Sequence, residues 1–445
     1  MLETEVHTFR YDNGLVQRVQ SVRLDRFEDL HFFSPSYSKE VFHRICNLYR
    51  DYIIRKYAWL FGKIVIYELP EDMVLDLPDT YAEHGRIFDP LAILTIQFEK
   101  HIKVKNRELV FTDEKVREVF ERLKEIGSLC VAEGKRNIIF FLPVSRKLGF
   151  MSECLKDAKV KVNSSFFVMD LFDRATVYDQ AGFPVGLRLE NGKVLSPPLF
   201  DREVLMIEKE GKVKISYLSI RDITVSIDGM EYRDGLNASF YSRPGHVVSD
   251  KDGFDIVICD DEVMAVKKGG QTAVPASGFV MKVKEELQIK DRKVSYSGLD
   301  DLSFAIQVGN SAIVDGKKTE RFLSPFYNFL RPSSVAYPPS MYPLNYRRAR
   351  APRIILGSDK DDRPVFLWIE GAGKFGYVKG RDSCGASLAE TAEICEKLGL
   401  KNAVHLDGGG SAQILIDNKR QLLLSDRDPQ THAGIERGIP VGLYL

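Results

Sequence analysis

Short apolar runs separated by turn residues make up most of the chain, and this pattern predicts strands more often than helices. Near the C-terminus, an apolar run over residues 403–406 leads into Asp407 and three glycines, and a second apolar run covers residues 412–416. We expect two short strands joined by a glycine turn. Upstream, residues 353–357 and 365–371 show the same pattern around a polar turn, which predicts a hairpin.

A helical period separates this hairpin from the glycine turn. Ser387 and Glu390 have the spacing of a capping box, in which two side chains bond the first N–H groups of a helix. Gly399 supplies a stop signal at the other end. The apolar positions between them follow a helical period: Leu388, Ala392, Cys395 and Leu398. We therefore predict one helix before the glycine turn.

The remaining pattern divides the chain in two. From residue 155 onward, alternating strands with glycine turns predict a long antiparallel meander, and residues 436–445 predict a strand that is central in a sheet. Residues 1–154 mix predicted strands with helices, and their first strand, residues 15–24, is a candidate for the larger sheet. The predicted fold class is α+β: a β-rich catalytic domain with mixed or antiparallel sheets and few helices over residues 155–445, plus an N-terminal α/β extension over residues 1–154.

Three segments carry less information. Residues 41–60 and 112–126 predict helices of the N-terminal extension. Residues 325–352 are rich in proline, tyrosine and arginine and show no period. Two interpretations of this last segment remain open: an ordered loop that lines a cleft, or an irregular connection.

Composition restricts the partners. The 63 basic residues balance 63 acidic residues, so no nucleic acid or anionic membrane is expected as the main partner. None of the six cysteines lies in a C-x-x-C pair, so no zinc ribbon or redox motif is visible. No run approaches the roughly 18 apolar residues of a membrane span, and the N-terminus lacks the features of a signal peptide. We expect a cytoplasmic protein without a membrane span, and homo-oligomerisation is left open.

The stretch around Asp407 is the strongest candidate site. Gly408, Gly409 and Gly410 have no Cβ to shield the backbone, so their N–H groups could face a bound oxyanion beside the carboxylate. The alternative is a glycine-rich hairpin in which the aspartate only caps the turn. Ser411 is either a substrate ligand or a hydroxyl that bonds to the turn.

The order and spacing of the motifs resemble the phosphodiester glycosidase domain family, which includes uncapping-type N-acetylglucosamine-1-phosphodiester α-N-acetylglucosaminidases. The resemblance rests on Pro352-Arg353, Leu356-Gly357, Glu370-Gly371, the helix start at 385–390, and residues 406–411. Upstream, residues 163–167 resemble the family's Asn-Gly-Gly-Phe-Phe segment, with Ser164 and Ser165 in place of the two glycines. The family also has Asp at the position of Glu370 and Asn at the position of His405.

The resemblance implies a glycosidase that cleaves a sugar from a phosphodiester at the anomeric carbon. Asp407 would be the essential carboxylate, as nucleophile or as base, with Glu370 as its partner. Arg353 would bind the phosphate, because a guanidinium matches phosphate oxygens in pairs. The predicted substrate-binding residues are Asn163, Asn237, Gly408, Gly409, Gly410, Ser411, His405 and Arg437. His405 is either a proton carrier or a strand histidine with a structural hydrogen bond.

Three functions remain open at this stage. The first is hydrolysis of a sugar-1-phosphodiester, such as an α-N-acetylglucosaminyl phosphodiester, in polysaccharide or glycoconjugate processing. The second is hydrolysis of ordinary glycosides by the same fold, and the third is a non-catalytic carbohydrate-binding or structural role. The expected partner is a carbohydrate or sugar phosphate. No cofactor is certain, and a divalent cation held by Asp407 and Glu370 stays open.

Overall fold

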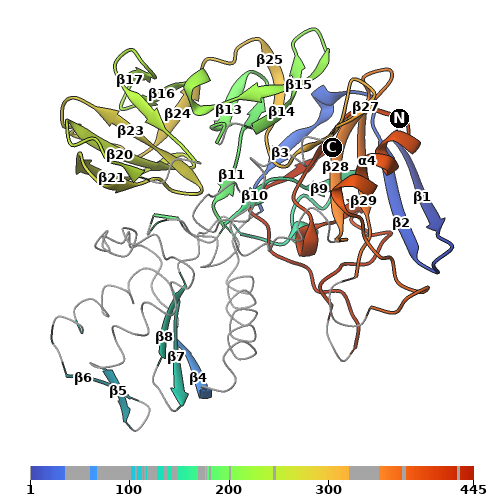
Figure 1. The fold of residues 1–445 in the computed structure, drawn as a ribbon, viewed down its shortest axis with the longest axis horizontal. Helices are drawn as coiled ribbons and strands as arrows, with labels where there is room; N and C mark the ends of the chain where they lie inside the picture. The colour runs from blue at the N-terminus through green and yellow to red at the C-terminus, as the bar shows by residue number, and fades with distance from the viewer. Residues whose placement is uncertain are drawn as a thin grey trace.

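The protein is described here by a computed structural model (Figure 1). The structure describes residues 2–35, 61–67, 102–105, 108–112, 114, 117, 128–134, 138–142, 148–168, 176, 178–179, 182–199, 202–243, 247–319, 350–372, 377–427 and 431–445. This part of the chain is built mainly from antiparallel sheets and contains one α-helix, α4 (Leu388–Lys397). The β-rich α+β fold class is therefore confirmed. No helix in the described residues is long and apolar enough to cross a membrane.

A seven-stranded sheet carries the candidate site. Its order is β1-β2-β29-β28-β30-β26-β27, and all neighbouring strands run antiparallel. The strands are β1 (Glu3–Arg10), β2 (Val16–Arg23), β26 (Ser311–Val314), β27 (Lys317–Lys318), β28 (Arg353–Asp359), β29 (Pro364–Ile369) and β30 (Leu400–His405). The predicted hairpin over residues 353–371 is confirmed as β28 and β29.

Helix α4 covers one face of this sheet. The Ser387 side chain accepts a hydrogen bond from the Glu390 N–H, and the Glu390 side chain accepts one from the Ser387 N–H, so the predicted capping box is confirmed. The buried side of α4, including Cys395, packs with Ile355 and Leu367 of the sheet. The opposite face of the sheet belongs to a larger core that it shares with the other sheets.

A second sheet of four strands lies next to the first. Its order is β3-β32-β9-β31, with β3 (His31–Phe33), β32 (Gly442–Tyr444), β9 (Val160–Asn163) and β31 (Ile414–Ile416). The final strand β32 has a neighbour on each side, as predicted. Because β30 and β31 belong to different sheets, the glycine turn is a crossing between sheets, and the hairpin alternative is wrong.

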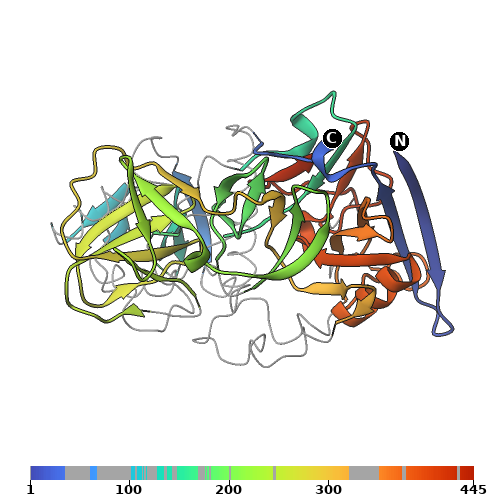
Figure 2. The ribbon, with the colours of Figure 1, turned by 90° about the horizontal axis from the view of Figure 1, so that it is seen from above.

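The long meander forms the sheets at the other end of the molecule, as the two views in Figures 1 and 2 show. One sheet has eight strands: β12 (Arg188–Glu190), β13 (Lys193–Ser196), β14 (Arg202–Glu208), β15 (Val213–Leu218), β16 (Thr224–Ile227), β17 (Met230–Arg233), β24 (Val294–Ser297) and β25 (Leu302–Ile306). Another has four: β18 (Ser239–Tyr241), β20 (Phe254–Cys259), β21 (Glu262–Lys268) and β23 (Gly278–Val283). Two short pairs add β10 (Phe166–Phe167), β11 (Pro184–Val185), β19 (Val247–Val248) and β22 (Thr272–Ala273).

The N-terminal region contributes to more than one part of the fold. Strands β2 and β3 pair with the C-terminal strands β29 and β32, as proposed for residues 15–24, and β1 pairs with β2 at the edge of the seven-stranded sheet. Within the described residues, the later strands of this region pair only among themselves: β4 (Phe61–Tyr67), β5 (Ile102–Lys105), β6 (Glu108–Phe111), β7 (Ser128–Gly134) and β8 (Ile138–Leu142). The boundary at residue 154 stays a prediction. Strands β1 to β3 precede it in the sequence, but the sheets that they join are otherwise formed by strands after residue 154. The predicted helix 41–60, most of 112–126 and most of the segment 325–352 lie outside the described residues.

Candidate functional site

Three of the predicted site residues lie at one edge of the seven-stranded sheet. β28 begins at Arg353, and its antiparallel neighbours β29 and β30 end at Ile369 and His405. Glu370 follows the end of β29 directly in the sequence, and Asp407 lies two residues after the end of β30. Because the start of an antiparallel strand lies beside the ends of its neighbours, the sheet brings Arg353, Glu370 and Asp407 to the same edge.

The glycine turn runs closely past the start of β28. A Cβ added to Gly408 would lie 2.7 Å from the carbonyl oxygen of Pro352, so only a glycine fits there without a shift. The Gly409 N–H donates to the same oxygen over 3.0 Å, and Gly409 has a φ of +59°, which favours glycine. The Gly408 N–H bonds to the Asp407 carboxylate. These two N–H groups therefore hold the turn and the carboxylate.

Asn163 fastens both ends of the turn. Its Nδ2 donates to the carbonyl oxygen of Asp407 over 2.7 Å, and its Oδ1 accepts from the N–H of Gln413 over 2.9 Å. The side chain is fully buried at the end of β9. Asn163 lies at the predicted site, but its contacts indicate that it positions Asp407. A direct contact with substrate stays a prediction.

The Asp407 carboxyl has an unusual ionisation. Burial raises its pKa to about 7, while hydrogen bonds from Ser411 and Gly408 and the charge of Arg437 act in the opposite direction. The residue nevertheless retains partial exposure to solvent. A carboxyl group that is both reachable and half-ionised near neutral pH is typical of a catalytic acid or base.

Arg437 is the cation whose charge acts to lower the pKa of the Asp407 carboxyl. Its guanidinium forms an ion pair with Asp426, in which Nε and Nη2 lie 3.1 and 2.7 Å from Oδ2. The pair lies directly over Gly410, where an added Cβ would fall 2.1 Å from Arg437 Nη2 and 2.2 Å from Asp426 Oδ2. An alanine at position 410 would therefore displace the ends of these two side chains.

Arg353 and His405 form a deeper layer of the site. The Arg353 side chain is buried, and its Nε donates to the Ala386 carbonyl oxygen over 3.0 Å. His405 Nδ1 bonds to the Asn310 carbonyl oxygen over 2.8 Å. Burial, and then the charge of Arg353, lower the pKa of His405 to about 4, so the imidazole is neutral at neutral pH. Its Nε2 has no hydrogen-bond partner among the described residues.

Glu370 lies in a separate charged cluster. Side chains alternate along a strand, so Glu370 follows Trp368 onto the face of the sheet opposite to Arg353. It is buried, and its Oε2 lies 3.4 Å from Arg18 Nη1 while its Oε1 lies 3.8 Å from Arg427 Nη2. Burial raises the pKa of Glu370, and the two guanidinium groups oppose that shift only in part.

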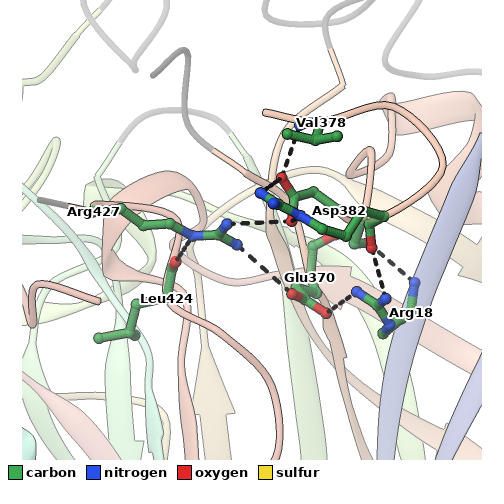
Figure 3. Close-up of polar contacts among 8 residues, drawn as sticks. Arg18, Glu370, Val378, Asp382, Leu424 and Arg427 are labelled. Atoms are coloured by element: carbon green, nitrogen blue, oxygen red, sulfur yellow. Dashed lines mark hydrogen bonds and ion pairs between the residues drawn. The ribbon is translucent and has the colours of Figure 1, made fainter. Parts of the chain in front are cut away.

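Arg427 joins this cluster to a neighbouring loop (Figure 3). Its Nη1 lies 3.6 Å from the Asp382 carboxylate, and its Nε donates to the Leu424 carbonyl oxygen over 3.0 Å. Burial acts to raise the pKa of Asp382, but hydrogen bonds from Arg381 and from the backbone, together with the charge of Arg427, outweigh it and leave that pKa below its ordinary value. The cluster is thus a largely buried network of alternating charges that holds three chain segments together.

Sequence reasoning missed Arg18, Asp426 and Arg427. Arg18 lies in a predicted strand where alternation gives no reason to expect an inward charge, and the other two lie in an irregular loop. The only signal in the sequence was that Asp426 and Arg427 are adjacent, and such Asp-Arg pairs are common on protein surfaces.

Asn237 does not join the site. It is exposed in the turn after β17, where its Oδ1 accepts from the Arg233 N–H over 2.9 Å and its Nδ2 donates to the Glu231 carbonyl oxygen over 2.8 Å. β17 lies at the far end of the molecule from β28 (Figure 1). In the described residues, no group of three or more His, Cys, Asp or Glu side chains could hold a metal ion.

Comparison with known proteins gives one family match. Residues 235–445 match the model of the phosphodiester glycosidase family, which confirms the resemblance drawn from the motifs. No protein with a curated description matches the chain. The matched residues include Arg353, Glu370 and Asp407, whereas Asn163 and strands β1 to β3 lie outside them although they complete the same sheets.

Solved structures resemble the chain only remotely. A hypothetical protein from Synechocystis is 14% identical with a TM-score of 0.41, and the chain is covered in full but spans only 62% of that protein. The catalytic domain of zebrafish N-acetylglucosamine-1-phosphodiester alpha-N-acetylglucosaminidase, auto-inhibited by its pro-peptide, is 11% identical with a TM-score of 0.43 and coverage of 100% and 82%. A putative exported protein from Burkholderia pseudomallei is 14% identical with a TM-score of 0.43 and coverage of 100% and 96%.

Proposed function

From the phosphodiester glycosidase family, to which residues 235–445 belong, we propose that this protein hydrolyses a sugar-1-phosphodiester, such as an α-N-acetylglucosaminyl phosphodiester, in polysaccharide or glycoconjugate processing. The family supports a hydrolase of the glycosidase type. One observation carries the finer proposal: Asp407 has a pKa of about 7 on a glycine turn against which the guanidinium of Arg437 lies.

The reaction requires little from a general acid. The bond between the anomeric carbon and the phosphate oxygen breaks, and the phosphate leaves as an anion that is far more stable than an alkoxide. The site must instead supply a carboxylate for the developing positive charge and a cation for the phosphate. Asp407 would act either as the nucleophile or as the base that takes a proton from water, and both roles need the ionised carboxylate.

The surroundings of the two arginines assign them different parts. Arg437 has a quarter of its side chain exposed, so it can reach a phosphate oxygen. Arg353 is buried and lies beside His405. We therefore place the phosphate against Arg437 and give Arg353 the role of a positive charge behind the site.

The surroundings of Glu370 favour a positioning role. Its carboxylate lies between two guanidinium groups and on the sheet face opposite to Arg353, whereas a second catalytic carboxylate should face the same sugar as the first. Glu370 would then hold the strand end that Asp407 lies beside. Its predicted catalytic role remains a prediction that mutation can test.

A second candidate is hydrolysis of ordinary glycosides, and the same pKa favours it. A carboxyl group that is half protonated near pH 7 can also donate a proton to an alcohol leaving group. The two candidates predict opposite pH dependence. The rate should rise through about pH 7 when ionised Asp407 is needed, and should fall through the same region when protonated Asp407 is needed.

The test compares an α-N-acetylglucosaminyl 1-phosphodiester with p-nitrophenyl α-N-acetylglucosaminide. We expect preference for the phosphodiester, a rate that rises to a plateau above about pH 7, and loss of at least about a hundredfold in Asp407→Asn. Asp417→Asn is the matched control, because it removes an exposed carboxylate from a surface turn ten positions later. Equal rates for Asp407→Asn and the wild type would exclude the proposed site, and faster release from the ordinary glycoside would favour the second candidate.

A further inference from the structure

Three consecutive residues of one loop touch the site. The Ser425 hydroxyl donates to the Gly409 carbonyl oxygen over 3.2 Å. Asp426 pairs with Arg437, and Arg427 reaches Glu370 at 3.8 Å. The backbone of Asp426 is held independently, since its carbonyl oxygen accepts from the N–H of Ile435 over 2.7 Å. The loop is therefore fixed on both sides of the Asp426 side chain.

Asp426 places a carboxylate where the proposed reaction needs a phosphate. Two nitrogens of the Arg437 guanidinium converge on the single oxygen Oδ2 of Asp426. Both partners retain solvent access, with 25% and 34% of their side chains exposed. The pair lies against Gly410, three residues after Asp407. A phosphate oxygen that approaches Arg437 must therefore compete with, or lie beside, a negative charge supplied by the protein.

The charge of the ligand decides how strongly it would feel this carboxylate. A phosphodiester carries one negative charge, whereas the phosphomonoester released by hydrolysis carries nearly two at neutral pH, because its second pKa is about 6. Repulsion between like charges grows with the product of the charges. A nearby carboxylate therefore weakens the binding of a dianion about twice as much, in free energy, as the binding of a monoanion.

We propose that Asp426 is a built-in competing anion that selects the monoanionic phosphodiester substrate over dianionic phosphates, including the phosphomonoester product. It holds the Arg437 guanidinium in the free protein, and it selects by repelling a bound dianion about twice as strongly, in free energy, as a bound monoanion. This role rests on the proposed function for its meaning, since only a phosphodiester glycosidase releases a phosphomonoester at this position. The electrostatic selection itself can be measured without any turnover.

The experiment measures binding by calorimetry at fixed ionic strength and pH 8. Inorganic phosphate is the dianionic probe and dimethyl phosphate is the monoanionic probe. Asp426→Asn removes one charge from a partly exposed ion pair, so it should raise the affinity for inorganic phosphate about tenfold. Dimethyl phosphate should tighten only about threefold, because half the repulsion in free energy is the square root of the factor. Asp417→Asn should bind both probes as the wild type does, and Arg437→Met should lose both.

Several results would overturn the proposal. These are equal tightening of the two probes, no tightening of either probe, weaker binding in Asp426→Asn, or no binding of either probe by any variant. Asp426→Ser removes the same charge and provides the comparison if the asparagine variant does not fold. Hydrolysis separates this failure from failure of the proposed function. An inactive protein that still shows the tenfold and threefold pattern refutes the function alone, and an active protein without the pattern refutes the role of Asp426 alone.

Discussion

Replacing Asp407 with asparagine should stabilise the protein above neutral pH while it abolishes activity. The folded protein holds this carboxyl at a pKa of about 7, against an ordinary value of 3.8, mainly because of burial. The gap of about 3 pKa units, at about 1.4 kcal/mol for each unit, corresponds to about 4 kcal/mol. Because solvent reaches part of the carboxylate, we expect a measured effect of about 2–4 kcal/mol. Asparagine keeps the shape of the side chain and removes this cost.

The sign of the pH dependence follows from which state holds the proton. Between about pH 4 and pH 7 the unfolded chain releases the Asp407 proton and the folded protein keeps it. The free energy of unfolding of the wild type therefore falls as the pH rises through this window and becomes constant above it. The asparagine variant has no such proton. The difference in free energy of unfolding between this variant and the wild type should thus be near zero at pH 4 and largest above pH 7.

The assay is urea unfolding at intervals between pH 4 and pH 8.5 for the wild type, Asp407→Asn and Asp417→Asn. Other ionisable groups cancel when variants are compared at the same pH, so the difference isolates one carboxyl. The Asp417→Asn difference should be small and flat, since this carboxylate is 65% exposed. A flat difference for Asp407→Asn, or a variant that is less stable at pH 8 than the wild type, would refute the raised pKa and with it the argument for a neutral-pH catalytic carboxyl.

Three further predictions concern the frame of the site. Asn163→Ala removes two buried hydrogen bonds that hold the ends of the glycine turn, so the free energy of unfolding should fall by about 1–3 kcal/mol and activity should fall with it, as measured by urea unfolding and initial rates. Gly410→Ala should lower activity, because its Cβ would fall 2.1 Å from Arg437 Nη2 and displace the guanidinium, whereas Gly409→Ala meets open space and should lower only the free energy of unfolding, by about 1 kcal/mol for its φ of +59°. Equal loss of activity in both variants would contradict this. Deletion of residues 442–445 removes the internal strand β32 and should leave a chain without a cooperative unfolding transition, and a cooperative transition at the wild-type midpoint would show that β32 is dispensable.

Local chemistry explains what could be predicted from the sequence. The capping box of Ser387 and Glu390 involves residues three positions apart, so it is visible without a fold. The motif around Asp407 was visible because the carboxylate and the three glycines are consecutive in the sequence. These features also carried the family resemblance, which the match over residues 235–445 confirms.

Only tertiary structure decided how these pieces act together. Sheet membership of the strands on either side of the glycine turn depends on pairing with distant segments, so no local pattern distinguishes a hairpin from a crossing between sheets. The partner cations were equally hidden: Arg18 lies 352 positions from Glu370, and Arg437 replaces Arg353 as the accessible cation beside Asp407 because burial differs between them. Sequence determined which residue types were available and where the chain turns. Packing determined which charges are desolvated and which meet, because burial and electrostatic coupling depend on neighbours that are close only after folding.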